Sequence, residues 1–539
     1  MKSFKTTFFI TLFLATGFSL LAQSEVLTGS EVPVIETNNG KVRGYVHSGI
    51  HTYKGIPYGT AKRFELAEKP KAWEGIKSTT MYGPVSPLIN PTTSIQDEPE
   101  FVFDHDWGFP NEDCLSLNIW TPNVSDNKKR PVMFWIHGGG FTAGSSHELP
   151  SYDGENLAKK GDVVIVSINH RLNVLGFLDL SAYGEKFKHS ANNGISDLVL
   201  ALEWVRDNIS SFGGDPNNVT IFGQSGGGAK VNTLMAMPKA KGLFHKAINQ
   251  SGSFRTAILE KEETQAIGKE TLSQLGLNDS NVESIQNIPY EVLAKASTKA
   301  LTIVAKKMRA AGKPVIGFGL NWGPSKDGID LPYHLSSAEV LQLSKDVPLL
   351  IGTTKNEFTP FRNMRFVGAS EETIMNHIKK TYGEKADAYI SAVKKAYPND
   401  TDPKDLLDID TMFRPGAVVQ ANEKSALKEG APVFMYLFTW QSPVFDGKYK
   451  SLHCMELPFT FDNIDAANKM TGGGAEAHQL AEKMSGAWLN FAKTGNPNYK
   501  NLPEWPEYNS TNTATMHFDL TCKVQPQLDK ELFSIVTEN

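Results

Sequence analysis

A serine between glycines is the first feature of the sequence that could carry chemistry. The segment Gly223-Gln224-Ser225-Gly226-Gly227 directly follows an apolar run that ends at Phe222, and a helix-compatible run from Ala229 to Ala236 comes after it. A sharp strand-to-helix turn exposes a serine hydroxyl in strained geometry, and glycines let the backbone pass closely. The helix N-terminus favours developing negative charge. Ser225 is therefore a candidate acyl-transfer nucleophile, with a purely structural turn as the alternative.

A second glycine-rich segment, His137-Gly138-Gly139-Gly140-Phe141, also follows an apolar run. Its backbone N–H groups could turn toward a substrate oxygen and, with the N–H of Gly226, form an oxyanion hole. A phosphate-binding loop is one alternative, but the Gly-Lys-Ser/Thr ending of such loops does not follow. A plain glycine turn is the other. The order of the two segments, each after a strand-like run, favours acyl transfer.

A serine nucleophile needs a general base, and the base needs a carboxylate to orient it. The histidines that follow Ser225 and could serve as the base are His245, His334, His377, His453, His478 and His517. His453 lies in a loop-like segment after the apolar run Val433 to Phe438. Composition alone does not choose among these histidines.

The orienting acid also has several candidates. Glu357 lies in a polar segment after the apolar run that ends at Ile351-Gly352, and Asp327 and Asp330 are its rivals. Where a serine of this kind follows a strand of an α/β fold, the chain order is nucleophile, acid and histidine, which all three carboxylates satisfy. Position alone leaves the choice open.

The elements that must position these residues alternate between two patterns. Short, continuously apolar runs occur at Pro131–Ile136, Asp162–Ile168, Asn218–Gly223 and Val347–Gly352. Such runs are typical of parallel strands that are covered on both faces. Between them, residues 195–208 place Leu198, Leu202 and Val205 at helical spacing. The alternation predicts an α/β fold with a mostly parallel central sheet and helices on both faces.

The same alternation of strand-like and helix-like segments indicates the domain organisation. We predict a single domain over residues 23–539, with helical insertions at roughly 257–312 and 371–430 that form a cap. A plain structural role for both insertions is the alternative. A small β-hairpin is predicted at residues 34–44, around an Asn38-Asn39-Gly40 turn.

The first residues have the composition of a secretory signal peptide. Lys2 and Lys5 precede an apolar stretch from Phe8 to Leu21, which ends at Ala22-Gln23-Ser24-Glu25. We predict a signal peptide at residues 1–22 and a secreted or periplasmic mature protein without stable membrane insertion. The apolar stretch is short for a membrane span, although an uncleaved anchor is the alternative.

The overall composition is that of an ordinary globular protein. The chain has 539 residues, of which 40% are hydrophobic and 21% charged, and its formal net charge is −5. This balance argues against nucleic acid as a partner. The three cysteines, Cys114, Cys454 and Cys522, exclude a disulfide-stapled scaffold.

The chain resembles the type-B carboxylesterase and cholinesterase family over nearly all of the sequence after the signal peptide. The motifs that carry this resemblance are Tyr53–Tyr58, Asn111–Ile119, His137–Phe141, Val174–Phe177, Phe212–Pro216, Gly223–Gly227, Gln250–Gly252, Asp327–Gly328 and Gly495–Pro497. The resemblance implies an α/β-hydrolase fold.

The resemblance also assigns the site residues. The family's acid ends a Lys-Asx-Glu pattern, which Glu357 fits, and its histidine stands shortly before Glu-Leu-Pro, as His453 does. The implied catalytic triad is Ser225, Glu357 and His453. Gly139, Gly140 and Gly226 fall on the family's oxyanion donors, and Ser251 falls on a buried position behind the triad.

Three positions depart from the family pattern. Gln224 and Gly226 stand where the family usually has Glu and Ala. Gln224 removes a negative charge near the reaction centre, which weakens the case for cationic, choline-like substrates. Ser86 stands where the family has the usual partner of Cys114, so that disulfide is expected to be missing.

The resemblance implies a serine carboxylesterase, a carboxylic ester hydrolase that acts through an acyl-enzyme on a small-molecule ester and needs no metal or organic cofactor. Amide or carbamate hydrolysis shares this chemistry and stays open. A catalytically inactive binding protein of the same fold is the alternative outside the enzymes, and the intact triad argues against it. The acyl and alcohol groups and the oligomeric state stay open.

Overall fold

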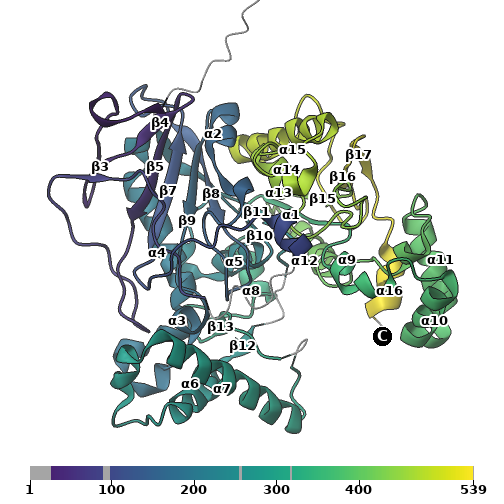
Figure 1. The fold of residues 1–539 in the computed structure, drawn as a ribbon, viewed down its shortest axis with the longest axis horizontal. Coiled ribbons are helices and arrows are strands. Elements are labelled where there is room, and N and C mark those ends of the chain that lie inside the picture. Colours follow the sequence, from purple (N-terminus) through teal and green to yellow (C-terminus); the bar gives the residue numbers. More distant parts are fainter. Residues whose placement is uncertain (1–25, 89–96, 254–257, 316–318, 538–539) are drawn as a thin grey trace, which may run out of the picture.

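A twelve-stranded sheet forms the centre of the part of the chain that the structure describes (Figure 1). The structure is a computed structural model that describes residues 26–88, 97–253, 258–315 and 319–537. The predicted signal peptide at residues 1–22 lies outside the described residues. In spatial order the strands are β1 (Val26–Leu27), β4 (Tyr45–His47), β5 (Ile50–Pro57), β7 (Ser116–Thr121), β9 (Val164–Ile168), β8 (Arg130–Ile136), β10 (Gly214–Gln224), β11 (Lys246–Gln250), β14 (Leu349–Thr354), β15 (Val433–Phe438), β16 (Thr515–Phe518) and β17 (Lys523–Gln525).

The strands from β9 to β16 in this order are parallel to one another. The strands outside them, from β1 to β7 at one edge and β17 at the other, pair antiparallel with their neighbours. The prediction of a mostly parallel α/β sheet is confirmed. The predicted hairpin is present as β2 (Ile35–Thr37) and β3 (Gly40–Arg43), which form a small sheet with β6 (Ile76–Ser78).

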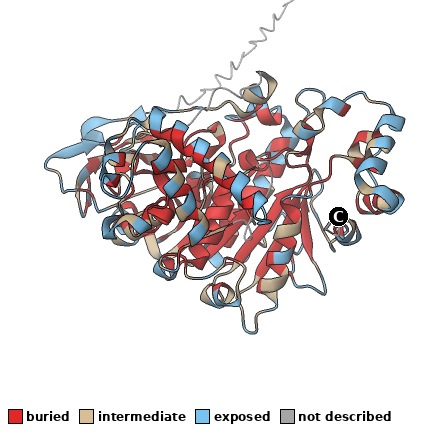
Figure 2. Cartoon of the chain, turned by 90° about the horizontal axis from the view of Figure 1, so that it is seen from below, coloured by how far each residue is buried: buried red, intermediate tan, exposed pale blue. Residues whose placement is uncertain are grey.

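Successive residues of the central strands enter two different cores. On β8, Phe134 and Ile136 belong to one apolar cluster, whereas Met133 and Trp135 belong to the other. Because side chains alternate across a strand, both faces of the sheet are covered and the strand sequence is apolar throughout. Figure 2 shows the buried sheet residues as a continuous layer beneath the partly exposed helices.

Different helices cover the two faces. One face packs against α4 (Asn193–Asn208), α5 (Gly226–Ala236) and α12 (Arg414–Ser425), which supply Leu198, Val231 and Ala417 to the first cluster. The other face packs against α2 (Glu155–Gly161), α13 (Leu457–Phe461) and α15 (Ala475–Thr494). Shorter helices are α1 (Asp97–Phe103), α3 (Asn173–Phe177), α8 (Ala338–Leu343), α9 (Thr359–Arg362) and α14 (Asn468–Thr471).

The two segments predicted as insertions are largely helical. The first contains α6 (Lys261–Gln274) and α7 (Tyr290–Ala310), which lie against each other at one end of the molecule (Figure 1). The two-stranded sheet of β12 (Leu259–Glu260) and β13 (Ser325–Lys326) lies beside them. The second contains α10 (Glu371–Tyr382) and α11 (Ala386–Ala396), which share a small core with α16 (Lys530–Thr537), and then α12.

Two further findings concern the cysteines and the membrane. All three cysteines are unpaired, and Cys114 is buried. Ser86 accepts a hydrogen bond from the backbone N–H of Leu172 instead of forming a bridge. In the described ranges, no helix combines the length and the apolarity that a transmembrane helix requires.

Candidate active site

Ser225 occupies a strained turn between β10 and α5. Its backbone has φ 56° and ψ −122°, and its N–H donates to the carbonyl oxygen of Gln250 (2.8 Å) on the neighbouring strand. A Cβ atom on Gly227 would lie 2.0 Å from the carbonyl oxygen of Ile136. The turn therefore needs glycine where the backbone of α5 passes the end of β8.

His453 and Glu357 come together from two loops beyond β15 and β14. The Nδ1–H of His453 donates to Oε2 of Glu357, and both side chains are buried. Oε1 of Glu357 accepts hydrogen bonds from Ser251 Oγ (2.6 Å) and from the N–H of Thr354 (3.0 Å). Because Nδ1 carries the proton, Nε2 keeps the lone pair that a general base needs.

Three backbone positions around this pair have positive φ without being glycine. They are Ser251 (φ 53°), Glu357 (φ 47°) and Cys454 (φ 73°). Such conformations cost free energy and persist where the surrounding structure holds them. The site is therefore built from residues whose backbone is fixed by the packed strand ends.

Burial dominates the electrostatics of the pair. It lowers the pKa of His453 below its usual value, so the imidazole is neutral near pH 7. Burial raises the pKa of Glu357, and hydrogen bonds from Ser251 and Thr354 oppose that rise. Burial and then the charge of Glu357 raise the pKa of both Asp410 and Glu456 to about 7.

Gln224 packs against the imidazole of His453. Its Nε2 lies 3.4 Å from both ring nitrogens, so the amide covers the ring rather than bonding to one nitrogen. Its Oε1 accepts a hydrogen bond from the thiol of Cys454 (3.2 Å). Phe358 and Phe413 lie beside the same ring, with centroid distances of 4.1 and 4.8 Å. The imidazole is thus held between an amide and two aromatic rings.

The glycine loop after β8 lies against the start of α5. Gly139 and Gly140 have φ values of 76° and 63°, which glycine adopts without strain. A Cβ atom on Gly226 would lie 2.2 Å from the carbonyl oxygen of Gly140 and 2.4 Å from its N and Cα atoms. The loop therefore occupies the space that the methyl group of an alanine at position 226 would need. This contact gives a physical reason for the departure at Gly226.

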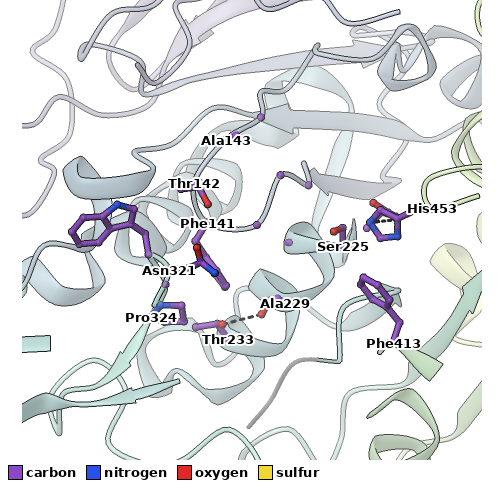
Figure 3. A pocket seen from close by; sticks show the side chains of 18 of the residues that line it. Phe141, Thr142, Ala143, Ser225, Ala229, Thr233, Asn321, Pro324, Phe413 and His453 are labelled. Carbon is purple, nitrogen blue, oxygen red and sulfur yellow. Dashed lines mark hydrogen bonds between the residues drawn. The ribbon is translucent and has the colours of Figure 1, made fainter. Parts of the chain in front are cut away.

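Ser225, His453 and the glycine loop all line one cavity of about 810 Å³. Figure 3 shows Ser225 and His453 on one side of it, with Phe413 near them and Phe141 and Asn321 across the space. Its lining also includes apolar and aromatic side chains, among them Phe103, Trp107, Ile258, Leu320, Trp322 and Leu335. A cavity of this size holds a small organic molecule.

The other predicted candidates lie away from these residues. Asp330 pairs with His189 (2.7 Å) and Lys239 (2.8 Å), and Asp327 accepts backbone N–H groups within its own turn. His245 accepts the N–H of Val219. In the described part of the chain, none of the rival acids and histidines lines the cavity.

Sequence reasoning missed Lys230, a fully buried lysine on α5. Its Nζ donates to the carbonyl oxygens of His137 (3.1 Å) and Gly138 (3.4 Å) in the glycine loop. The available signal was a single charged residue within the otherwise uncharged run Gly226–Ala236.

No group of three or more His, Cys, Asp or Glu side chains within the described residues is arranged as a metal site.

Comparisons with known proteins agree over most of the chain. Residues 31–535 match the model of the carboxylesterase family. Para-nitrobenzyl esterase from Bacillus subtilis (strain 168) is 36% identical over 92% of this chain and 97% of its own length. Phenmedipham hydrolase from Pseudarthrobacter oxydans is 32% identical over 90% of this chain and 94% of its own. The solved structure of a Clostridium hathewayi esterase that can hydrolyze aliphatic aromatic polyesters superimposes with a TM-score of 0.81. It is 37% identical and covers 96% of this chain and 100% of its own.

Proposed function

This chain belongs to the carboxylesterase family and is a carboxylic ester hydrolase, and from that premise we propose that Ser225, Glu357 and His453 are its catalytic triad. The observation that carries the proposal is the buried hydrogen bond from His453 to Glu357 beside a cavity that Ser225 also lines. Ser225 is the nucleophile, His453 the general base and Glu357 the group that fixes the imidazole tautomer.

The reaction proceeds in two halves. His453 Nε2 takes the proton of Ser225 as its oxygen attacks the ester carbonyl carbon, and the carbonyl oxygen becomes an oxyanion. The N–H groups of Gly139, Gly140 and Gly226 bind that oxyanion. The C–O bond to the alcohol breaks, the alcohol leaves with the proton from His453, and Ser225 carries the acyl group. Water then repeats the sequence and releases the carboxylic acid.

Esters with an aromatic group are the substrate class that we expect. The cavity is walled by Phe103, Phe141 and Trp322, and rings of this kind favour contact with a flat apolar group. The similar proteins named above include a para-nitrobenzyl esterase and an esterase that hydrolyses aliphatic aromatic polyesters. Both names support an aryl-containing ester.

Carbamate cleavage is the second candidate, favoured by the similarity to phenmedipham hydrolase. It would use the same attack by Ser225 and the same oxyanion donors, because a carbamate also has a carbonyl carbon that serine can attack. Comparing turnover of an aryl ester and an aryl carbamate that share one leaving group separates the two candidates.

We also propose that residues 1–22 direct export, so that the mature enzyme works in the periplasm or outside the cell. The charged start and short apolar stretch support this proposal. N-terminal sequencing of the protein recovered from the periplasm and the medium tests it, and a mature chain that still begins at Met1 in the cytoplasm contradicts it.

The experiment that tests the triad is a rapid-mixing burst assay with p-nitrophenyl esters of increasing acyl length. The wild type should release close to one equivalent of p-nitrophenol before steady turnover, because p-nitrophenolate is a good leaving group and acylation is then faster than hydrolysis of the acyl-enzyme. Ser225→Ala should show no burst, whereas Ser210→Ala, which changes an exposed serine, should match the wild type. Full turnover by Ser225→Ala would refute the assignment and bring another nucleophile forward, whereas a wild type without turnover would favour the inactive binding protein.

A further inference from the structure

Lys230 is a buried lysine directly behind the glycine loop. It lies on α5, whose first residue follows Ser225, and its side chain has no exposed surface. Removing an ammonium group from water is costly unless polar groups compensate it. A lysine that served only to fill this space would be less favourable than an apolar side chain of the same length. The position therefore calls for an explanation in terms of charge.

The ammonium group contacts the carbonyl ends of two consecutive peptide groups. Nζ donates to the carbonyl oxygen of His137 (3.1 Å) and to that of Gly138 (3.4 Å). In a trans peptide the C=O and N–H bonds point in opposite directions. The N–H of Gly139 belongs to the same peptide group as the Gly138 carbonyl, so it points away from Lys230. Gly139 itself lines the cavity with Ser225.

A second donor fixes the same carbonyl. Nδ1 of His137 lies 3.0 Å from the Gly138 oxygen and donates to it as an N–H. Burial, then the charge of Lys230, lowers the pKa of His137 well below its usual value, so this ring is neutral. The Gly138 carbonyl thus accepts from both Lys230 and His137, and the plane of its peptide group is fixed from behind.

Burial lowers the pKa of Lys230 to about 7, and the nearby charge of Glu148 favours its ammonium form. Glu148 is the carboxyl group whose charge acts on Lys230, and burial raises the pKa of Glu148. The hydroxyl of Tyr152 donates to Glu148 (3.3 Å). Burial, then the charge of Lys230, also lowers the pKa of His170, whose ring stacks on that of His137 at 5.1 Å.

We propose that Lys230 is a positioning residue for ester hydrolysis, whose ammonium group holds the carbonyl side of the glycine loop so that the Gly139 N–H is aimed at the oxyanion and polarised toward it. The inference rests on the proposed oxyanion hole. Hydrogen bonds in a chain strengthen one another, here from Nζ–H through the peptide group to the N–H of Gly139. A positive charge behind the loop also attracts the oxyanion through a low-dielectric interior. Both effects act mainly when the negative charge is present, in the transition state.

Lys424 provides a matched control in the same chain. It is also a buried lysine, on α12, and its Nζ donates to the carbonyl oxygens of Ser344 (2.7 Å) and Lys345 (3.5 Å). It does not line the cavity that Ser225 lines. Replacing it removes a buried ammonium group and two hydrogen bonds to backbone carbonyls without touching the glycine loop.

The test compares Lys230→Met with Lys424→Met in the full-length mature enzyme. We expect Lys230→Met to lower kcat for a p-nitrophenyl ester by about 10- to 100-fold with KM within about twofold, because loss of a whole oxyanion donor costs about 10²- to 10³-fold. An aryl trifluoromethyl ketone, which gives an oxyanion when serine adds to it, should bind more weakly by the same factor. An aryl amine with the same aryl group, which has no carbonyl carbon for serine to attack, should bind with unchanged affinity. Lys424→Met should change none of these values.

The outcomes separate the inference from the proposed function. Wild-type kcat and ketone affinity in Lys230→Met, or equal kcat losses in both lysine variants, overturn the role of Lys230. Full turnover by Ser225→Ala instead overturns the triad itself. If Lys230→Met fails to fold, as judged by circular dichroism, Lys230→Gln is measured. Lys230→Gln keeps an amide donor but removes the charge, so kcat and the affinity for the ketone should both fall. Unchanged values in Lys230→Gln would also overturn the positioning role of Lys230.

Discussion

Ser251 Oγ donates a 2.6 Å hydrogen bond to the carboxylate oxygen of Glu357 that does not contact His453. Ser251 directly follows β11, and Glu357 lies in the loop after β14, which is the neighbouring strand of the sheet. Both residues are buried. Glu357 is therefore held from both sides, by Ser251 on one oxygen and by His453 on the other. Its orientation toward the imidazole does not depend on solvent.

Ser251→Ala should lower kcat by about 10- to 100-fold and leave KM unchanged. A hydrogen bond to a charged group is worth about 1.5–3 kcal/mol, and about 1.4 kcal/mol corresponds to a factor of ten. Alanine keeps the Cβ atom, so the strain at φ 53° is the same in both proteins. Steady-state kinetics with a p-nitrophenyl ester give the answer, with Ser210→Ala as control. A larger effect on KM than on kcat would contradict a role through Glu357.

The pH dependence of the wild type should reflect the burial of His453. The base must be neutral to take the proton of Ser225, and burial lowers the pKa of this imidazole from its usual 6.5. A lowered pKa keeps the base form present at more acidic pH, so the acid limb of kcat/KM should lie below pH 6.5. A kcat/KM profile measured from acidic to neutral pH checks this. An acid limb above that value would contradict it.

Gln224→Glu should move this acid limb to higher pH. The substitution places a carboxylate where Nε2 of Gln224 now lies, 3.4 Å from the ring nitrogens of His453. A nearby negative charge stabilises the imidazolium and raises its pKa, so the base is lost at a less acidic pH. Gln441→Glu, at an exposed position, makes the same change in net charge and should leave the profile as it is. Coinciding profiles for the wild type and Gln224→Glu would show that Gln224 does not act on the imidazole.

Gly226→Ala should lower kcat by about 10- to 100-fold. The new methyl group would lie 2.2 Å from the Gly140 carbonyl oxygen, so the glycine loop must move away from α5. Displacing an oxyanion donor costs part of the roughly 10²- to 10³-fold that it contributes. Gly474→Ala is the control, because a Cβ atom there meets nothing within 4 Å. Unchanged kcat and an unchanged trifluoromethyl ketone affinity would mean that the loop tolerates the methyl group.

Arg414→Ala should destabilise the protein by about 3–5 kcal/mol, because it leaves Asp529 buried without its cation. The two side chains form a buried ion pair that joins α12 to the segment before α16. Urea unfolding followed by circular dichroism measures the loss. The double variant Arg414→Met/Asp529→Leu should recover most of it, since no uncompensated charge remains. A double variant that is less stable than Arg414→Ala would contradict this account.

The central strands could be predicted because both faces of the sheet are covered. The runs at Pro131–Ile136 and Val347–Gly352 overlap β8 and β14, whose alternate side chains enter opposite cores. Short antiparallel strands near the ends of the sheet, such as β4 and β17, have no such signal because neither strand is buried throughout. Their pairing depends on the neighbours that the tertiary fold supplies.

The site could be predicted only in part from the residues. Ser225 and the glycine loop are local patterns whose spacing carries the chemistry. Glu357 and His453 are far apart in sequence, so position alone left rivals for both, and the family resemblance made the choice. Lys230 could not be found this way. A charged residue on a helix usually marks an exposed face, and its partners here are backbone carbonyls of a distant loop.

The positive φ angles at Ser225, Ser251, Glu357 and Cys454 have a consequence for laboratory evolution of this enzyme. Each such residue costs about 1 kcal/mol or more relative to a glycine, which adopts this conformation freely. A screen that rewards thermal tolerance alone should therefore enrich glycine at Ser225, the proposed nucleophile, whereas glycine at Ser251 or Glu357 would lose buried hydrogen bonds that outweigh the strain. Libraries that vary this region need selection for turnover in every round, because a substitution that raises thermal stability here can also remove a residue needed for catalysis.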